Sequence, residues 1–370
     1  MSNLQNKILG SWFGMAVGDA MGAAVRGLKP ATVAQCFGQM DGFKDVRRFI
    51  GKGVKQYRMS GLYGSRTQIA LAVCDSLLKN KNLAFDDIAT NLQLLAHHGP
   101  ENYFGVYRRA DAWLKKSLHN LSERHNLLPA DTNVSHGGFI SASIPVALYY
   151  LKNPKDPRRQ CMETCLLLTR NPWEVTGAAL TGFLIRQFAA IDVEGAESGL
   201  ALDANKILSS AVDYCRDAEK YFKERYPEVW QEFGDEKGSA LSRAFQSLRE
   251  DFPQLEHADL LRSICRNASR YQKQPISHAA QGHVLTLLPL AVVMVLKAKD
   301  GFASALTSSL NMGGEADTLG VLTGALAGAL YGYSGIPAAW KSSLVNAGEI
   351  KARGEALLKR KLSSAMKNFV

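Results

Sequence analysis

The chain has 370 residues, 46% of them hydrophobic and 21% charged, a composition that can bury a large core and excludes a broadly disordered protein. Lys and Arg outnumber Asp and Glu by 44 to 34, and the resulting formal charge of +10 favours anionic partners without choosing among them. Six cysteines without a Cys-x-x-Cys pair suggest neither a disulfide framework nor a zinc ribbon.

The hydrophobic pattern is helical along almost the whole chain. Residues 67–78 and 85–95 carry apolar side chains at i, i+3 and i+4, the pattern of helices with one buried face. Residues 176–190 and 284–296 are apolar nearly all round, which predicts helices at the centre of the fold. Alternating runs rich in Val, Ile and Thr are almost absent. The sequence therefore predicts an all-α fold of many helices, with little or no sheet.

No linker divides the chain, and we expect a single domain over residues 1–370. Residues 193–275 are richer in charged side chains and predict amphipathic helices in a peripheral, more variable lobe. The apolar stretch at 8–25 contains Asp19 and four glycines without a cleavage-type boundary, and the 13-residue run at 284–296 is shorter than the about 20 residues that span a bilayer. We therefore expect no membrane segment and a cytoplasmic location, with export by a non-classical route as the alternative.

Two glycine-rich stretches suggest close packing or ligand binding. Small residues recur every four positions from Gly10 to Gly22, which places them on one helix face where another helix can approach closely, with Asp19 at the edge. Gly137 and Gly138 open a second helix, and the free backbone N–H groups of such an opening suit a phosphate. For the first stretch, the alternative to a functional Asp19 is a packing motif that has a carboxylate beside it by chance. For the second, the alternative to a phosphate site is a plain helix N-terminus.

A third glycine-rich stretch, at 311–320, carries a concentration of oxygen donors. Glu315, Asp317 and Thr318 fall within four residues at the start of a small-residue helix. Hard divalent cations bind such oxygens. The alternative is a helix N-terminus with a capping residue and an acidic first turn.

Taken in this order, the motifs resemble those of the ADP-ribosylglycohydrolase family, the enzymes related to the dinitrogenase-reductase-activating glycohydrolase. The resemblance covers most of the chain and rests on residues 14–22 (GMAVGDAMG), 61–71 (GLYGSRTQIAL), 136–145 and 313–319 (GGEADTL). It implies an orthogonal all-α bundle with a cleft for ADP-ribose. It also implies two magnesium ions, which polarise the ribose and orient water for hydrolysis of the bond between ribose and a modified side chain.

The sequence departs from the family pattern at positions that carry the chemistry. Residues 64–66 read Gly-Ser-Arg where the family has Thr-Asp-Asp, and Arg26 stands where the opening motif ends in a catalytic-type Glu. Gly137 and Ala142 replace the expected Asn and Arg of the middle motif, and Glu315 replaces an Asp. These changes put the two-metal chemistry in doubt.

A count of the charges at the implied metal site indicates that the two magnesium ions no longer bind there. The carboxylates of Glu315 and Asp317 balance the guanidinium groups of Arg26 and Arg66 without any metal. A guanidinium repels a cation but forms a two-pronged bond to a carboxylate. We therefore expect Arg66 to occupy the vacated region and pair with Glu315 or Asp317. The alternative is that Arg66 points to solvent and one metal still binds.

The expected function is a family member without ordinary two-metal hydrolysis, a pseudoenzyme that binds ADP-ribose, a related nucleotide, or an ADP-ribosylated or acidic protein. The alternative is an active ADP-ribosyl hydrolase with altered metal use or different chemistry. Nucleic acid is disfavoured because the basic residues lack interleaved aromatics, and no membrane partner is expected. No cofactor is expected, although magnesium at a residual site of Glu315, Asp317 and Thr318 stays open. The catalytic candidates are Asp19, Glu315 and Asp317, and the ligand-binding candidates are Arg26, Arg66, Thr67, Gly137, Gly138 and Thr318.

Overall fold

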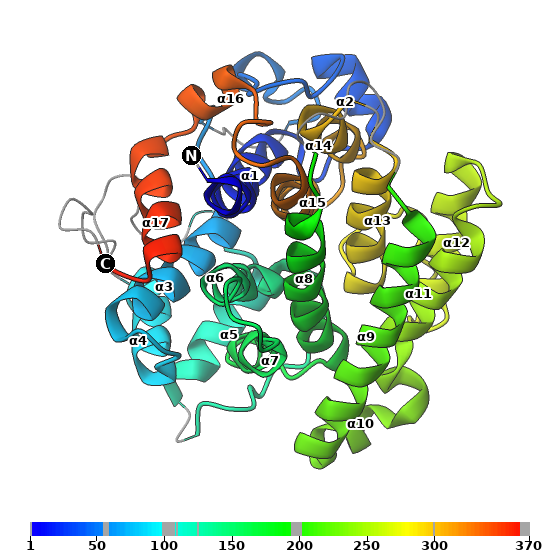
Figure 1. The fold of residues 1–370 in the computed structure, drawn as a ribbon. Helices are drawn as coiled ribbons and strands as arrows, with labels where there is room; N and C mark the ends of the chain where they lie inside the picture. The colour runs from blue at the N-terminus through cyan, green and yellow to red at the C-terminus, as the bar shows by residue number, and fades with distance from the viewer. Residues whose placement is uncertain are drawn as a thin grey trace.

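The computed structural model describes residues 2–54, 59–97, 108, 110–123, 126–193, 202–298 and 300–362. Within these ranges the regular elements are helices, and the one β contact is an isolated bridge between Ile50 and Val54 (Figure 1). The prediction of an all-α fold is confirmed. Residues 194–201 of the predicted lobe and residues 363–370 at the C-terminal end of the sequence lie outside the described ranges.

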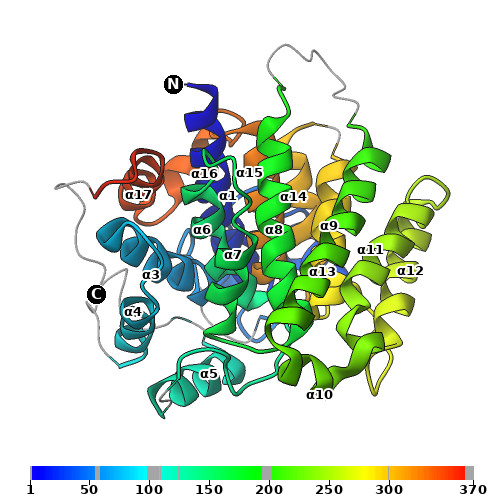
Figure 2. The same cartoon turned by 60° about the horizontal axis from the view of Figure 1, so that its bottom comes forward.

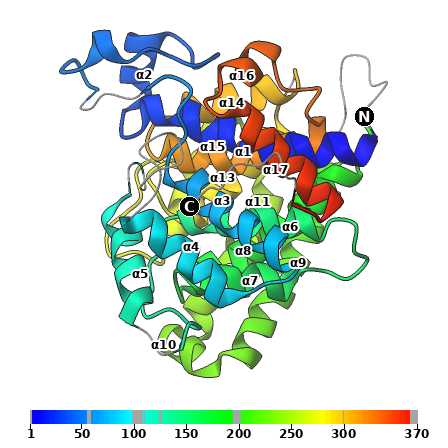
Figure 3. The same cartoon turned by 90° about the vertical axis from the view of Figure 1, so that its left-hand side faces the viewer.

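Two helices in direct backbone contact form the centre of the molecule. α1 (Asn3–Val25) and α15 (Ala316–Tyr331) lie side by side (Figures 1 and 3). A Cβ added to Gly18 would overlap the carbonyl oxygen of Gly320. Gly10 faces Gly328 while Gly22 faces Ala316, so the two helices run antiparallel. The predicted close approach is confirmed, and the partner of the first glycine stretch is the third.

The apolar character of α1 reflects its place in the core. By length and composition it could cross a membrane, but its whole apolar window is buried inside the fold. The helix begins at a Ser2 cap, whose Oγ accepts a hydrogen bond from the Gln5 N–H at 3.3 Å. It ends just before Gly27, which has a φ of +79° and turns the chain.

Helices on several sides enclose the central pair. α8 (Pro172–Ala190) and α13 (Val284–Leu296) are buried nearly all round, as predicted, and contact α15 together with α14 (Phe302–Leu310). α8 starts at Asn171, whose Oδ1 accepts from the Trp173 N–H at 3.0 Å, with Pro172 at the first helical position. The other helices outside the lobe are α2 (Pro30–Phe37), η1 (Arg47–Phe49), α3 (Ser65–Asn80), α4 (Phe85–His97), α5 (Ala112–Glu123), η2 (Gly138–Ser143), α6 (Ile144–Tyr149), α7 (Arg158–Leu166), α16 (Ala338–Ser343) and α17 (Ala347–Lys359).

The charged segment near the middle of the sequence forms helices at one side of the molecule (Figures 1 and 2). α9 (Ala204–Arg225) and α11 (Ala240–Asp251) pack against α8, and α11 and α12 (His257–Ser269) pack against α13. Their apolar faces point inward and their charged faces outward, as their composition predicts. That the whole chain is one domain stays a prediction. The lobe consists of α9 (Ala204–Arg225), α10 (Pro227–Gly238), α11 (Ala240–Asp251) and α12 (His257–Ser269).

Candidate functional site

The four segments that carry the family resemblance meet where several helices begin or end. The C-terminal end of α1 lies beside the start of α15 because the Gly27 N–H donates to the Gly314 carbonyl at 2.7 Å and the Gly314 N–H donates to the Leu28 carbonyl at 2.9 Å. The starts of α3 and η2 lie beside this junction of α1 and α15. Side chains from residues far apart in the sequence are therefore brought within hydrogen-bond distance.

Asp19 holds the start of α3 in place. Its Oδ2 accepts hydrogen bonds from the Thr67 backbone N–H at 2.9 Å and from the Thr67 hydroxyl at 2.8 Å. Gly64, at the N-cap of α3, has no side chain with which to cap the helix, so Asp19 supplies the acceptor from another helix. Asp19 and Thr67 are both fully buried. This geometry gives Asp19 and Thr67 a structural role, and their predicted catalytic and ligand-binding roles stay predictions.

Arg26 bridges the two carboxylates at the start of α15. Its Nη2 lies 2.9 Å from Glu315 Oε2 and its Nη1 lies 3.1 Å from Asp317 Oδ2. The Arg26 side chain is 18% exposed, so this pair of contacts borders solvent. Burial and the neighbouring charge of Asp317 raise the pKa of the Glu315 carboxyl. The carboxylates that the sequence assigns to a residual metal site are therefore bound to a guanidinium.

Arg66 does occupy the interior of this region, but the prediction of its partner was wrong. Its side chain is 1% exposed and its Nη2 lies 2.7 Å from Asp111 Oδ2, a residue that the sequence did not single out. Its Nε donates to the Thr318 hydroxyl at 3.3 Å and its Nη1 donates to the Ser65 hydroxyl at 3.2 Å. Burial lowers the pKa of the guanidinium, but the charges of Asp111 and Asp317 raise it by more. The observed partner differs from the predicted one because Arg26 is already paired with the carboxylates of Glu315 and Asp317.

Asp111 joins α5 to the site. Its Oδ1 caps α5 by accepting from the Leu114 N–H at 2.8 Å, which leaves Oδ2 for Arg66 and, at 3.9 Å, for Arg26. Burial alone would raise the pKa of the Asp111 carboxyl, but the charge of Arg66 and the hydrogen bonds from Arg66 and the Leu114 N–H act together against it, and that pKa is lowered to about 2. The cap could be predicted from the sequence, because an Asp stands just before a helical pattern. The pairing of Asp111 with Arg66 could not, because no residue near Asp111 in the sequence indicates it. We call Arg26, Arg66, Asp111, Glu315 and Asp317 the arginine–carboxylate cluster.

The N–H groups at the glycine-rich start of η2 are not free, which corrects the prediction for Gly137 and Gly138. The buried Glu174 of α8 accepts from the Gly137 N–H at 2.9 Å and from the Phe139 N–H at 3.0 Å. The Gly138 N–H donates to His136 Nδ1 at 3.0 Å. Burial raises the pKa of Glu174 to about 7. An internal carboxylate thus takes the place predicted for a phosphate.

Gly138 has a different role, which is to leave room for Arg66. A Cβ on Gly138 would lie 2.5 Å from Arg66 Nε and 2.6 Å from His136 Cε1. The guanidinium and the imidazole therefore pass close to the same backbone atom. Only a residue without a side chain accommodates both groups at this distance.

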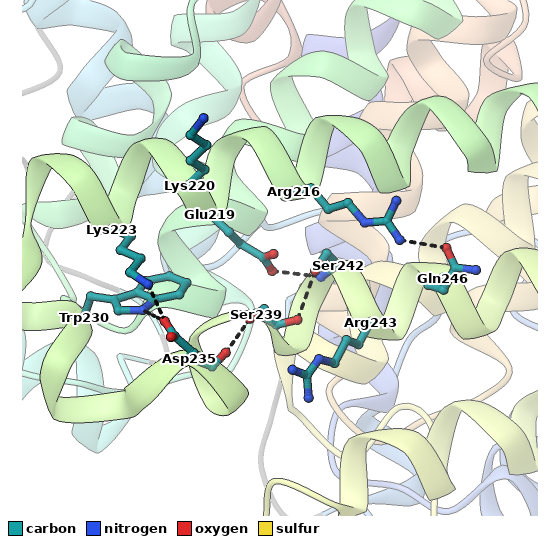
Figure 4. Close-up of a pocket in the computed structure, with 10 residues that line it drawn as sticks. All are labelled: Arg216, Glu219, Lys220, Lys223, Trp230, Asp235, Ser239, Ser242, Arg243 and Gln246. Carbon is teal, nitrogen blue, oxygen red and sulfur yellow. Dashed lines mark hydrogen bonds and ion pairs between the residues drawn. The ribbon is translucent and has the colours of Figure 1, made fainter.

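A pocket of about 420 Å³ lies in the lobe between α9, α10 and α11 (Figure 4). It shares no residue with the arginine–carboxylate cluster. Lys223 Nζ and Trp230 Nε1 each contact Asp235 Oδ1 at 2.7 Å. Glu219 accepts from the Ser242 N–H at 2.9 Å. The arginine–carboxylate cluster is the stronger candidate site, because the segments that carry the family resemblance meet there and not at this pocket.

Comparison with known proteins identifies the family. A family model described as ADP-ribosylglycohydrolase matches residues 1–366. The chain belongs to the ADP-ribosylglycohydrolase family. It is 24% identical over 342 residues to the ADP-ribosyl-dinitrogen reductase glycohydrolase of Rhodospirillum rubrum, covering 92% of this chain and 91% of that protein. It is 36% identical over 121 residues to the ADP-ribosylarginine hydrolase Tri1 of Serratia proteamaculans, covering 32% and 31%.

A solved structure supports the same fold. A chain described as part of an ADP-ribosylglycohydrolase-related protein complex superimposes with a TM-score of 0.66 and 20% identity, covering 98% of this chain and 100% of that one. The ADP-ribosylglycohydrolase fold is thus present along almost the whole length, including the lobe.

The residues present in this member of the family do not fit the pair of magnesium ions that the family resemblance implies. The Glu315 and Asp317 carboxylates face Arg26, and the Thr318 hydroxyl faces Arg66. A guanidinium cannot ligate a cation and repels one held a few ångströms away. Across the described residues, no group of three or more His, Cys, Asp or Glu side chains is arranged to hold a metal ion.

Proposed function

We propose that this member of the ADP-ribosylglycohydrolase family binds ADP-ribose, or a side chain that carries it, at the arginine–carboxylate cluster, without two-magnesium hydrolysis. The observation that carries the proposal is the pairing of Arg26 with Glu315 and Asp317. Through it, a fixed positive charge lies against the oxygens that would otherwise bind a metal. Family membership supports the ADP-ribose class of ligand.

The chemistry of the cluster supports binding over turnover. The Asp111 carboxyl, with its pKa of about 2, is too weak a base to take a proton efficiently from water near neutral pH. The Asp19 Oδ2 already accepts two hydrogen bonds from Thr67. The guanidinium groups of Arg26 and Arg66 offer only N–H donors, so they can donate to a ligand but cannot act as bases.

Calorimetric titration with ADP-ribose, with and without Mg²⁺, tests the proposal. We expect ADP-ribose to bind with the same affinity in both conditions, because no ligand-bridging metal contributes. Ribose 5-phosphate and AMP, added separately, show which half of the ligand supplies the affinity. Binding that requires Mg²⁺, or no binding of ADP-ribose at all, would contradict the proposal.

The second candidate function is an active hydrolase. The observation that favours it is similarity over 92% of the chain to a protein named as a glycohydrolase. Incubation with an ADP-ribosylated arginine substrate separates the two candidates. Release of ADP-ribose within tenfold of an ordinary enzyme rate, about 10 per second, would establish the hydrolase. We expect no detectable release.

A further inference from the structure

His136 contains a buried hydrogen-bonding atom that nothing in the fold uses. The residue is 9% exposed, and its Nε2 has no hydrogen-bond partner among the residues that the structure describes. A buried donor without an acceptor costs free energy and is rare in folded proteins. His136 is next to the arginine–carboxylate cluster, since Arg66, Asp111 and Arg26 are the charged groups that act on its imidazole.

The other ring nitrogen determines which tautomer is present. His136 Nδ1 accepts a hydrogen bond from the Gly138 N–H at 3.0 Å, so Nδ1 carries no proton. Burial, followed by the charge of Arg66, lowers the pKa of the imidazole to about 3, and the ring is neutral at physiological pH. The single proton is therefore on Nε2, which makes that atom a donor.

Two further contacts fix the position of the ring. Glu174 holds the backbone that directly follows His136 through the N–H groups of Gly137 and Phe139. The Phe139 ring packs edge-on against the imidazole, with centroids 4.5 Å apart. A donor held this rigidly loses little conformational freedom when it finds an acceptor.

We propose that His136 Nε2–H donates a hydrogen bond to a hydroxyl oxygen of the terminal ribose of bound ADP-ribose. The proposal rests on the proposed function, which puts the ribose end of the ligand at the cluster. A hydroxyl can accept from Nε2–H and donate to the Asp111 carboxylate. A phosphate fits less well, because three carboxylates outweigh the two guanidinium groups of the cluster. In the ligand-free structure Nε2 is shielded from solvent, so the ligand must displace the groups that cover it.

The substitution His136→Asn tests the proposal. The Asn side-chain oxygen can accept from the Gly138 N–H in the same i to i+2 arrangement, so the turn is retained, but no donor remains at the Nε2 position. We expect the affinity for ADP-ribose to fall about tenfold, the worth of one hydrogen bond to a buried group. The affinity for ADP, which lacks the terminal ribose, should not change. His136→Gln, whose amide can reach the Nε2 position, should recover part of the loss.

Nitrogen-15 spectra of the wild-type imidazole provide a readout that a merely structural histidine would not give. The Nε2–H resonance should shift on addition of ADP-ribose and stay in place with ADP. Equal affinities of wild type and His136→Asn for ADP-ribose, an equal loss for ADP, or an unshifted resonance in the ADP-ribose complex would each overturn the proposal while the proposed function stands. If the wild type binds no ADP-ribose, the proposed function and this inference fail together.

Discussion

Arg66 is a long cationic side chain held almost entirely out of water. Such a group is stable only while its counter-charge and hydrogen-bond acceptors are present, because water cannot replace them. Asp111, Thr318 and Ser65 supply those acceptors from three separate elements. Substitution at Arg66 therefore affects the carboxylates around it as much as the residue itself.

The substitution Arg66→Asp restores the type of residue expected from the family but should not restore hydrolysis. Arg26 still occupies Glu315 and Asp317, and residues that act as a catalytic unit cannot be repaired one at a time. The new carboxylate faces Asp111 without a counter-charge, so we expect the free energy of unfolding to fall by about 3–5 kcal/mol. Added Mg²⁺ should recover part of that loss without turnover.

Thermal unfolding and an ADP-ribose release assay check this prediction together. Arg48→Asp is the matched control, since it makes the same charge change at an exposed position and should alter stability by less than about 0.5 kcal/mol. Restored release of ADP-ribose by Arg66→Asp alone would show that Arg26 does not block the site.

Asp111 gives a prediction on pH. Its pKa is lowered to about 2 in the folded protein, against about 3.9 in an unfolded chain, so its pairing with Arg66 stabilises the fold above pH 4. That contribution, about 2 kcal/mol at neutral pH, should disappear as the pH falls from 4 through 2. Asp111→Asn keeps a capping oxygen for the Leu114 N–H but loses the charge.

Urea unfolding of wild type and Asp111→Asn across this pH range provides the measurement. The difference in unfolding free energy between them should be largest near neutral pH and shrink toward pH 2. A difference that stays constant with pH would mean that the charge of Asp111 contributes nothing to stability.

At the scale of elements, the contact between α1 and α15 determines where the site forms. Glycines on both helices let the backbones touch, so the register of one helix against the other cannot slip without steric overlap. That register places the end of α1, with Arg26, at the start of α15, with Glu315 and Asp317. The glycines that pack α1 against α15 therefore also bring the charged residues of the site together.

Gly18→Ala should disrupt this contact. The added methyl would overlap the Gly320 carbonyl, and backbone cannot move aside as a flexible side chain can. We expect a loss of about 3 kcal/mol or more in the free energy of unfolding, the upper end of overpacking effects. Gly348→Ala in α17 is the control. Its Cβ would meet nothing within 4 Å, and alanine in a helix should be neutral or stabilising by up to about 1 kcal/mol.

Chemical unfolding of the two glycine variants checks this prediction. Equal stability of Gly18→Ala and Gly348→Ala would show that α1 and α15 can separate without cost, contrary to the backbone contact seen here.

At the scale of the whole molecule, the arginine–carboxylate cluster joins elements that the chain itself leaves far apart. Ion pairs link α1 to α15 through Arg26, and α3 to the start of α5 through Arg66. A metal ion in such a place would do the same by ligation. Here the guanidinium groups connect the helix ends.

We therefore expect the stability of the protein to be independent of divalent cations. A bound ion raises the melting temperature in proportion to the logarithm of its concentration over its dissociation constant. Addition of Mg²⁺, or its removal with a chelator, should change the melting temperature by less than about 1 °C. A rise of several degrees with Mg²⁺, lost in a Glu315→Gln variant, would place a cation at the cluster.

The sequence by itself determined the fold class, the packing of the first glycine stretch and the family. The fold class and the packing follow from short-range regularities, since a helical period and a four-residue glycine spacing specify the faces of a helix wherever it lies. The family follows from the resemblance of four motifs to those of known members. The sequence also showed that Arg26 and Arg66 stand where the family has acidic residues, because this requires only a comparison of residue types at matching motif positions.

The tertiary structure alone decided which charges pair and which polar groups are used. Asp111 was missed, and Arg66 was assigned the wrong partner, because a carboxylate 45 residues away reaches the guanidinium only through the packing of α5 against its neighbours. The N–H groups of Gly137 and Gly138 were predicted to be free, because the sequence near them does not show that Glu174 of α8 and the His136 ring accept from them. Hydrogen-bond and ion-pair partners are chosen by proximity in the folded chain and by the need to satisfy every buried charge, and local sequence patterns contain neither.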